Sequence, residues 1–395
     1  MSILKVQKIR HTANNTDVLD IANDGTCRAN IVNNLSNRNL IINGAMQVAQ
    51  RGTSSTSQGF QTVDRFAVWF SGTDEAPTQA QVDVASGTTP YTSGFRKALK
   101  VTNGDQTNNG GASDYVFIRY KVEAQDLANS GWDYTNSNSF ITLSFWVKAS
   151  VAQTYNFRLE TADGTGQNFP FQYALSADTW TKITKTIPGN SNLQFDNNNG
   201  SGLELHWQMY RGTDFTDNSV ANDTWAAYAS GTRTKDATAT WYEANDATFE
   251  LTGVQFEVDH TGSGVATDFE HRSFAQELAL CQRYFYKVTK DGTDSEVTNM
   301  PIGIGLYYTA SDFRCIIDFP VEMRAAPTLT SNDNSGSYYI HYNSSHDGID
   351  RLDSFHNSKK RSMVRNTAHA SGTQGYPGML HQEDSNSSLT FSAEL

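Results

Sequence analysis

Apolar and polar residues alternate in short segments along most of the chain. In residues 141–148, apolar side chains stand at every second position beginning with Ile141, and similar alternation occurs in residues 116–122, 155–159 and 203–209. Successive side chains of a β-strand point to opposite faces, so a period of two predicts half-buried strands. Loops rich in Asn, Asp and Gly separate these segments, which is typical of a β-sandwich. The sequence therefore predicts an all-β protein.

The first two parts of the chain differ in how much apolar surface they can bury. Residues 1–37 hold only short apolar runs, at 3–6 and 18–21, between polar turns. Strand pairs of this size are marginal in water, so we expect an arm that copies of the chain or a docking partner would order. A frayed terminus is the alternative. Residues 38–268 are long enough for a large jelly-roll-like β-sandwich, with a bulge or bend at Gly253, where the alternation changes phase.

A change of period marks the next boundary. Residues 269–286 contain apolar residues at helical spacing, namely Phe274, Leu278 and Cys281. Ser273 with Gln276 matches a capping box, so we expect a short helical connector there. Residues 287–395 return to strand-like segments and predict a second β domain, whose long polar turns suit a variable recognition surface.

The charge balance excludes some partners. The 42 acidic residues outnumber the 30 basic ones, which gives a formal net charge of -12. Such a surface disfavours nucleic acid and anionic membranes as the main partners. The sequence has neither a stretch of about 18 apolar residues nor a leader-like N-terminus, so we expect synthesis in the cytoplasm without export or membrane insertion.

Neither the cysteines nor the known catalytic motifs indicate an enzyme. Cys27, Cys281 and Cys315 are odd in number and widely spaced, so we expect free, mostly buried thiols and no disulfide or zinc site. The nucleophile elbow, the zinc-protease motif, the P-loop and the dinucleotide-binding motif do not occur in the sequence. We therefore expect no enzymatic activity and no catalytic residues.

Aromatic residues in loop-like contexts are the first candidates for ligand binding. Their rings can stack on the apolar faces of sugars while Asn, Asp and Gln bind the hydroxyls. For each ring the alternative is packing in the core or at a subunit interface. The candidates are Trp132, Tyr134, Trp225, Tyr228, Trp241 and Tyr242.

Further candidates lie near the end of the chain. In residues 338–342 the alternation puts Tyr339 and His341 on one face and their neighbours on the other, so one of the two sets is core. With His346 in the following turn, Tyr339 and His341 form a second candidate surface. These histidines lack a nearby third ligand, and the Asp-rich loop at 214–223 lacks EF-hand spacing, so no metal site is expected.

Three parts of the chain carry a recognisable pattern. They are residues 2–9 together with 18–25, then residues 39–52, which begin Asn-Leu-Ile-Ile-Asn-Gly, followed by Thr62-Val-Asp-Arg-Phe, and finally residues 269–285, which begin Phe-Glu-His-Arg-Ser-Phe. Together they resemble a family of tail-fibre and tail-associated structural proteins of tailed bacteriophages. The resemblance implies that residues 1–37 are a virion-attachment arm, that three copies associate, and that residues 287–395, which it does not cover, form a receptor-binding tip.

The region between the last two of these parts also resembles the jelly-roll sandwich of carbohydrate-binding modules. That resemblance implies a fold compatible with glycan binding. A calcium ion often braces such sandwiches, held partly by an acidic residue on the final strand. The corresponding residues 251–254 of this chain are Leu-Thr-Gly-Val, without a carboxylate. We therefore expect no cofactor, and a structural Ca²⁺ ion has no support in the sequence.

One hypothesis and two alternatives follow. The hypothesis is a homotrimeric tail-fibre subunit in the virion, docked through residues 1–37 to phage tail or portal-proximal proteins. It would attach the particle to a host-surface glycan or an outer-membrane receptor, where three weak sites gain strength by avidity. The first alternative is a purely architectural component, such as a head fibre, collar or decoration, without receptor binding. The second is a polysaccharide depolymerase, which is disfavoured because the β-helix repeat of such tailspikes is not visible in the sequence.

Overall fold

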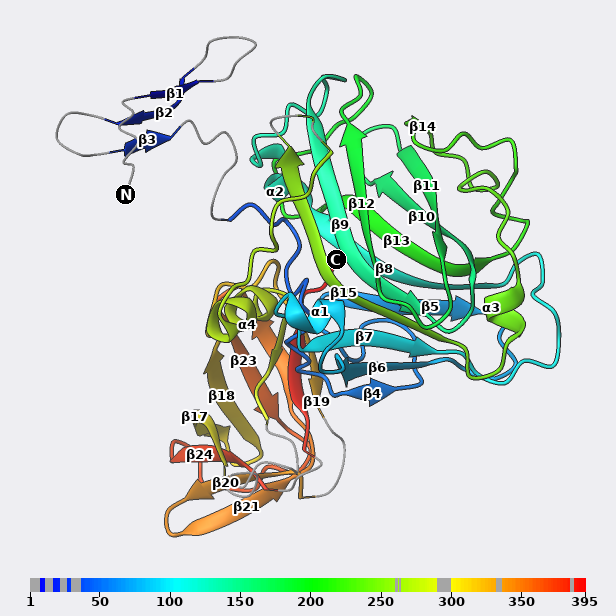
Figure 1. Cartoon of the computed structure of the whole chain (residues 1–395). Helices are drawn as coiled ribbons and strands as arrows, with labels where there is room; N and C mark the ends of the chain where they lie inside the picture. Colours follow the sequence, from blue (N-terminus) through cyan, green and yellow to red (C-terminus); the bar gives the residue numbers. More distant parts are fainter. Residues whose placement is uncertain are drawn as a thin grey trace.

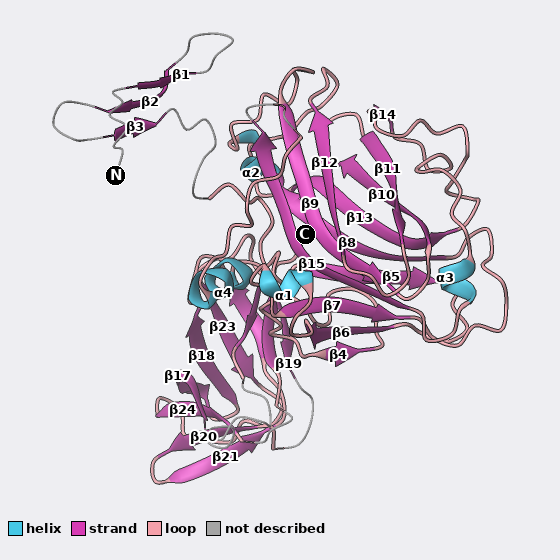
Figure 2. Cartoon of the chain, viewed as in Figure 1, coloured by secondary structure: helices cyan, strands magenta, loops and turns pink. Residues whose placement is uncertain are grey.

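The computed structural model describes residues 8–10, 17–21, 27–29, 37–259, 262, 264–289, 300–331, 336–383 and 387–395. The chain is 44% strand and 6% helix, which confirms the predicted all-β class. The described strands form five sheets (Figures 1 and 2). Within the described residues, no helix combines the length and apolar character needed to cross a membrane.

The N-terminal sheet contains three short antiparallel strands in the order β1-β2-β3. They are β1 (Lys8–Arg10), β2 (Asp17–Ile21) and β3 (Cys27–Ala29). The apolar run at 18–21 therefore forms β2, while the run at 3–6 lies outside the described residues. The pairing of this arm with other copies or with a virion protein stays a prediction.

A large sandwich of two six-stranded antiparallel sheets occupies residues 54–259. The first sheet, in spatial order, contains β14 (Ala226–Ala227), β11 (Gln167–Leu175), β10 (Gln153–Thr161), β13 (Ser201–Arg211), β8 (Tyr115–Glu123) and β5 (Phe66–Ser71). The second contains β12 (Thr181–Pro188), β9 (Phe140–Ala149), β15 (Thr248–Asp259), β7 (Lys97–Thr102), β6 (Thr78–Asp83) and β4 (Ser54–Ser55).

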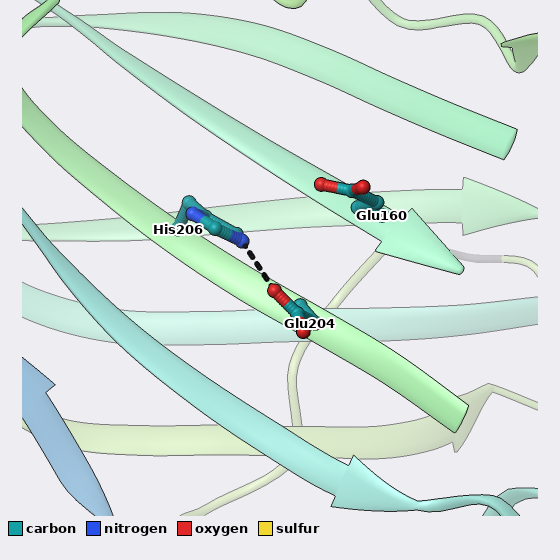
Figure 3. A group of neighbouring side chains, drawn as sticks. All are labelled: Glu160, Glu204 and His206. Carbon is teal, nitrogen blue, oxygen red and sulfur yellow. Dashed lines mark hydrogen bonds and ion pairs between the residues drawn. The ribbon is translucent and has the colours of Figure 1, made fainter. Parts of the chain in front are cut away.

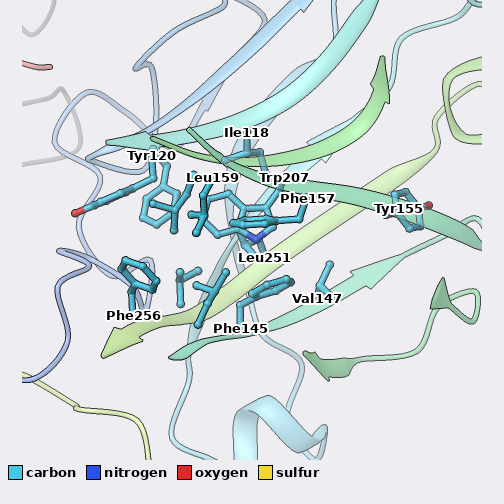
Figure 4. Close-up of a cluster of buried hydrophobic side chains, with 14 of the residues drawn as sticks. Ile118, Tyr120, Phe145, Val147, Tyr155, Phe157, Leu159, Trp207, Leu251 and Phe256 are labelled. Carbon is cyan, nitrogen blue, oxygen red and sulfur yellow. The ribbon is translucent and has the colours of Figure 1, made fainter. Parts of the chain in front are cut away.

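Aromatic and aliphatic side chains fill the space between the two sheets (Figure 4). The ring of Trp207 on β13 lies 5.8 Å from that of Phe145 on β9 and 5.2 Å from that of Phe157 on β10. All three side chains are fully buried, and each such burial stabilises the fold by about 2–3 kcal/mol. The apolar positions of the alternating segments thus form the core, and the intervening positions are left on the outer faces of the sheets.

Gly253 produces the bend predicted from the phase change. Its φ is 62°, and the register of β15 against β9 shifts between Thr252 and Gln255. A Cβ atom at this position would lie 2.7 Å from the ring of Phe95. Both the backbone conformation and the close contact therefore require glycine.

The predicted helical connector contains α4 (Phe274–Gln282). Its capping box is complete, since the backbone N–H of Gln276 donates to Ser273 Oγ and the backbone N–H of Ser273 donates to Gln276 Oε1. Cys281 is buried but Phe274 is 56% exposed, so the apolar positions do not all face the core. Three further helical turns among the described residues are too short to show a helical period in the sequence. They are α1 (Thr89–Thr92), α2 (Ala124–Ala128) and α3 (Thr240–Glu243).

The C-terminal domain consists of a seven-stranded sheet and a three-stranded sheet. The larger contains, in spatial order, β21 (Ser345–Ile349), β20 (Tyr338–Tyr342), β24 (Pro377–Gln382), β17 (Met300–Thr309), β18 (Asp312–Asp318), β23 (Arg361–Asn366) and β22 (Asp353–Asn357). The smaller contains β16 (Phe285–Lys287), β25 (Leu389–Ser392) and β19 (Thr328–Ser331). Tyr338 and Ile340 are buried in the core of the C-terminal domain. Of the two alternating sets in residues 338–342, theirs is therefore the core set.

Two cysteines have the predicted state. Cys281 and Cys315 are free and buried, and burial raises the pKa of the Cys315 thiol to about 12. Both are therefore protonated and unreactive at neutral pH. The side chain of Cys27 lies outside the described residues.

A buried ion pair joins the two domains. Arg65, 1% exposed, pairs with Glu394 and stacks on the ring of Tyr284, with 3.4 Å from its guanidinium carbon to the ring centroid. Arg51 also contacts Glu394, at 3.1 Å. Arg65 lies in the second and Tyr284 in the third of the sequence segments that carry the phage resemblance. These segments therefore build the domain junction.

Candidate functional site

A pocket of about 410 Å³ lies on the outer face of the first sandwich sheet, over β8, β10 and β13. Cavities of roughly 300–1,000 Å³ are typical of small-ligand sites. The lining combines basic and aromatic side chains with two glutamates. It consists of Tyr115, Phe117, Arg119, Arg158, Glu160, Glu204, His206, Arg211, Phe215, Tyr228 and Arg233.

Strand register places the polar members of the lining in two rows. Arg158 on β10 pairs with His206 on β13, which pairs in turn with Arg119 on β8. In the next row Glu160 pairs with Glu204. These positions alternate with core residues on each strand, so the period that predicts the core also places these side chains on the opposite face.

Residues 212–239, here called the roof loop, cover part of this face and contribute Phe215, Tyr228 and Arg233 to the pocket. Two sheet amides hold the loop in place. Asn168 Nδ2 donates to the carbonyl oxygen of Arg233 at 2.7 Å, and Asn156 Nδ2 donates to that of residue 235 at 3.0 Å. The pocket therefore exists only because the loop folds back over the sheet.

Both carboxylates of the pocket are already paired. Glu160 lies 2.5 Å from Arg158, and Glu204 lies 2.9 Å from Lys121 and 3.0 Å from His206 Nε2. Although burial opposes it, hydrogen bonds from His206 and Lys121 hold the pKa of Glu204 below its ordinary value. Burial and the charge of Arg158 lower the pKa of His206, so its ring is neutral at pH 7.

Arg211 has no such partner. Its side chain is 2% exposed, and its Nε and Nη2 atoms lack a hydrogen-bond acceptor. Its guanidinium carbon lies 4.6 Å from the ring centroid of Phe117 and 5.5 Å from that of Phe215, so aromatic rings flank the group. Burial, followed by the charges of Arg158 and Arg233, lowers the pKa of Arg211 well below its usual value. The surroundings thus penalise this positive charge.

The pocket is locally cationic on an acidic protein. Four arginines and two glutamates line it, which leaves a formal charge of +2 with His206 neutral, whereas the whole chain carries -12. Within the described part of the chain, neither Arg211 nor Arg233 has a carboxylate within ion-pairing distance. The electrostatics therefore favour an anion over a cation in this pocket.

A metal ion fits this arrangement less well. Glu160, Glu204 and His206 offer ligand atoms within 4.8 Å of one another (Figure 3). However, Arg158 and Lys121 already neutralise the two carboxylates. A cation would therefore have to displace these ion pairs and would meet further arginines around it.

The sandwich aromatics singled out from the sequence lie mainly inside the protein. Trp132, Trp225, Trp241 and Tyr242 are buried in the sandwich core, and Tyr134 packs against it. These positions correspond to the packing alternative. Tyr228 is different, since its ring lines the basic pocket.

The C-terminal candidates lie together on the outward face of the seven-stranded sheet. The Tyr339 ring is 5.1 Å from that of His346, and the rings of His341 and His346 are 6.2 Å apart. His341 also lies 4.5 Å from His381. His341 and His346 line a cavity of about 480 Å³. This is a second candidate surface, without the buried unpaired charge of the first.

Sequence reasoning missed the arginines of the basic pocket. Arg158 lies in a predicted strand segment, between Phe157 and Leu159, and Arg211 lies two residues beyond another predicted segment. A charged residue on the non-core face of a strand is usually solvated, so the pattern gave no reason to select them. The signal available was the accumulation of basic residues on segments that become neighbouring strands. This signal can be interpreted only when the strand order is known.

Comparisons with known proteins identify no family. No family model matches the sequence, and no curated protein matches it. The fold matches an enzymatically active domain of bacteriophage CBA120 tailspike protein 4 with a TM-score of 0.31 and 9% identity, over 56% of this chain and 21% of that chain. It matches a putative sugar-binding protein from Bacteroides thetaiotaomicron with a TM-score of 0.30 and 11% identity, over 56% and 100%.

A CBM4 module matches similarly, with a TM-score of 0.29 and 13% identity, over 55% of this chain and 98% of that one. At these TM-scores the matches carry no conclusion about activity or ligand. The β-sandwich class follows from the strand pairing of the chain itself.

Proposed function

We propose that this chain is a structural subunit of a phage tail fibre and that it binds a host-surface glycan. One observation carries the glycan-binding part of the proposal. The outer face of the sandwich holds a preformed pocket in which aromatic rings lie beside buried hydrogen-bond donors that have no acceptor. Sugars present both the apolar faces and the oxygen acceptors that such a lining selects.

The assignment to a tail fibre is supported by the sequence resemblance and by the location of the residues that carry it. Asn39 and Arg65 belong to the most diagnostic segment; Asn39 makes a buried hydrogen bond to Val254 within the sandwich, and Arg65 pairs with Glu394 across the domain junction. A scaffold with such a junction suits a load-bearing appendage. Association into trimers, docking through residues 1–37 and location in the virion are parts of the same proposal.

Binding without hydrolysis is the activity that the pocket supports best. A glycosidase requires one carboxyl group with a raised pKa as the acid and a second one about 5–9.5 Å away. The pKa of Glu204 is lowered, and Glu160 is paired with Arg158. This pair does not fit a hydrolytic role.

The proposal is tested with the full chain and purified host polysaccharide. We expect saturable binding by isothermal titration calorimetry, inhibition of phage adsorption by excess protein, and no release of reducing ends. A trimer in sedimentation experiments is also expected. Absence of any glycan binding by a correctly folded trimer would favour the architectural alternative, and release of reducing ends would identify a depolymerase.

The C-terminal cavity is the second candidate for the receptor surface. Deletion of residues 287–395 is a poor test because it would leave Arg65 without Glu394. Substitution of His346, which is exposed, by Ala is gentler. Loss of host adsorption in H346A with intact glycan binding would assign receptor recognition to the tip.

A further inference from the structure

We infer that the basic pocket selects a sugar residue that carries a carboxylate, and that Arg211 binds this carboxylate through two parallel hydrogen bonds. The inference rests on the proposed glycan-binding function and makes it specific. It identifies acidic glycans, built from uronic or related sugar acids, as the ligand class. It also distinguishes this pocket from a site for neutral glycans.

The unpaired edge of Arg211 is the first argument. Nε and Nη2 lie on one side of the guanidinium group, and both are buried without an acceptor. Leaving buried donors unpaired is costly, more so when the group is charged. Elsewhere in the chain, the same edge of another arginine binds a carboxylate: Arg283 donates to Glu123 through Nε at 2.8 Å and through Nη2 at 2.9 Å. The free edge of Arg211 has the geometry for the same bidentate contact.

The second argument is that the arginines are held in place but not neutralised. Phe117 and Phe215 flank Arg211, and the guanidinium carbon of Arg233 lies 4.8 Å from the centroid of the Phe215 ring. Ring stacking orients a guanidinium group and leaves its N–H edges available. The positions of these side chains are therefore fixed before the ligand arrives, which reduces the entropy lost on binding.

The third argument is the excess of positive charge. Arg158 is paired with Glu160, but Arg211 and Arg233 share the same cavity without a described carboxylate partner. Their mutual repulsion is strong because burial weakens screening by water. One bound carboxylate would relieve this repulsion and complete the hydrogen bonds of Arg211. A neutral sugar would do neither.

The size and the lining indicate a sugar acid and not a free inorganic ion. The cavity of about 410 Å³ is much larger than one small anion needs, and four aromatic residues contribute to its lining. Arg119 also borders a second cavity of about 730 Å³ between the two domains, which Arg51, Trp69 and Lys287 help to line. An acidic oligosaccharide could extend from the first cavity into the second along this basic path.

The experiment uses the full chain and defined glycans. The ligands are uronic-acid and sialic-acid tetrasaccharides, their carboxyl-reduced neutral counterparts and a sulfated neutral tetrasaccharide, with sodium acetate and sodium sulfate as ions alone. The variants are Arg211→Met, Arg211→Lys and, as a matched control, Arg361→Gln. Arg361 is 61% exposed and pairs with Asp318 on the C-terminal domain, so its substitution removes one positive charge far from the pocket.

We expect at least one carboxylated glycan to bind and its carboxyl-reduced counterpart to bind at least about 10-fold more weakly. R211M should lower affinity by about 10- to 100-fold, the loss expected for one bidentate charge-assisted contact. R211K retains the charge but not the fork, so it should also bind weakly. R361Q should bind as the unsubstituted chain does. The melting temperature of unliganded R211M should be unchanged or higher, because the substitution removes an unpaired buried charge.

Each other outcome overturns the inference in a recognisable way. Equal binding of acidic and neutral glycans would leave glycan binding intact but remove the carboxylate requirement. Preference for the sulfated glycan would replace the carboxylate with a sulfate ester. Stabilisation by acetate or sulfate with no glycan bound would indicate an ion site only, and the proposed function would fail as well. A marked loss of stability in R211M and R211K without ligand would show that Arg211 has a structural role instead.

Discussion

Glu394 is expected to hold the two domains together through one buried charge pair. Its carboxylate contacts Arg65, which is 1% exposed, and Arg51, at 3.1 Å. Substitution by Gln preserves the shape but leaves the guanidinium group of Arg65 buried without a counter-charge. Removing one partner of a buried pair typically costs about 3–5 kcal/mol. The cost should lie at the lower end of this range, because Arg65 keeps its hydrogen bond to the carbonyl oxygen of Lys121, at 2.8 Å, and is not left without an acceptor.

The expected change in the free energy of unfolding is therefore about 3 kcal/mol for E394Q. With a denaturant slope of about 3 kcal/mol per M, the urea midpoint of the unfolding step that separates the domains falls by about 1 M. Tryptophan fluorescence and limited proteolysis would follow this step. Glu322→Gln is the matched control, since Glu322 and its partner Lys360 are 53% and 75% exposed and 3.8 Å apart. A surface pair of this kind is worth about 0–1 kcal/mol.

A double substitution separates the energetic contribution of the ion pair from that of the packing around it. Arg65→Met combined with Glu394→Met replaces both charges by apolar groups, and such replacements are often neutral or stabilising. We expect the double variant to be more stable than either single variant. If E394Q costs no more than E322Q, or if the two single substitutions are simply additive, the reasoning about this junction is wrong.

Three further perturbations test the fold. Gly253→Ala should destabilise the sandwich by about 2 kcal/mol or more, because φ is 62° and the new Cβ would lie 2.7 Å from the ring of Phe95. Thermal unfolding would measure this loss of stability. Ser273→Ala should cost about 1 kcal/mol through loss of the α4 cap, whereas Ser273→Asp should keep most of it. Burial raises the pKa of Asp64 to about 6 from 3.8, although Arg51 opposes the shift. The folded state therefore binds this proton more tightly than the unfolded state, and the resulting stabilisation, about 3 kcal/mol, is complete below about pH 4 and is lost as the pH rises through about 6. The difference in unfolding free energy between the unsubstituted chain and Asp64→Asn should change by that amount between pH 4 and pH 7, and a constant difference would contradict the assignment.

Local rules were sufficient to predict several of the strands, the main helix and the bend. Ile141 and its alternating neighbours lie in β9, Ser273 caps α4, and Gly253 bends β15. Each of these features depends on residues close together in the sequence. The short turns α1, α2 and α3 were not predicted, because four or five residues do not complete a recognisable helical period.

The aromatic candidates show the limit of composition as a guide to binding. Trp241 and Tyr242 lie in a loop-like sequence but belong to the helical turn α3 and are buried. Tyr228, from a similar context, lines the pocket. The sequence alone could not separate these cases, because the chain between β13 and β15 turns some of its rings inward and others towards the sheet face.

The basic pocket required knowledge that no local pattern contains. Arg158 and Arg211 become neighbours only when β10 pairs with β13, and Arg233 joins them only when the roof loop folds back onto Asn168. The sequence between Arg158 and Arg211 includes β11 and β12, which belong to different sheets, so the proximity of the two arginines depends on strand order. On an acidic chain that lacks catalytic motifs, the basic pocket therefore depends on the order of the strands and on the folding back of the roof loop. For the same reason, substitutions that displace the roof loop should weaken ligand binding at least as much as the loss of Arg211 does.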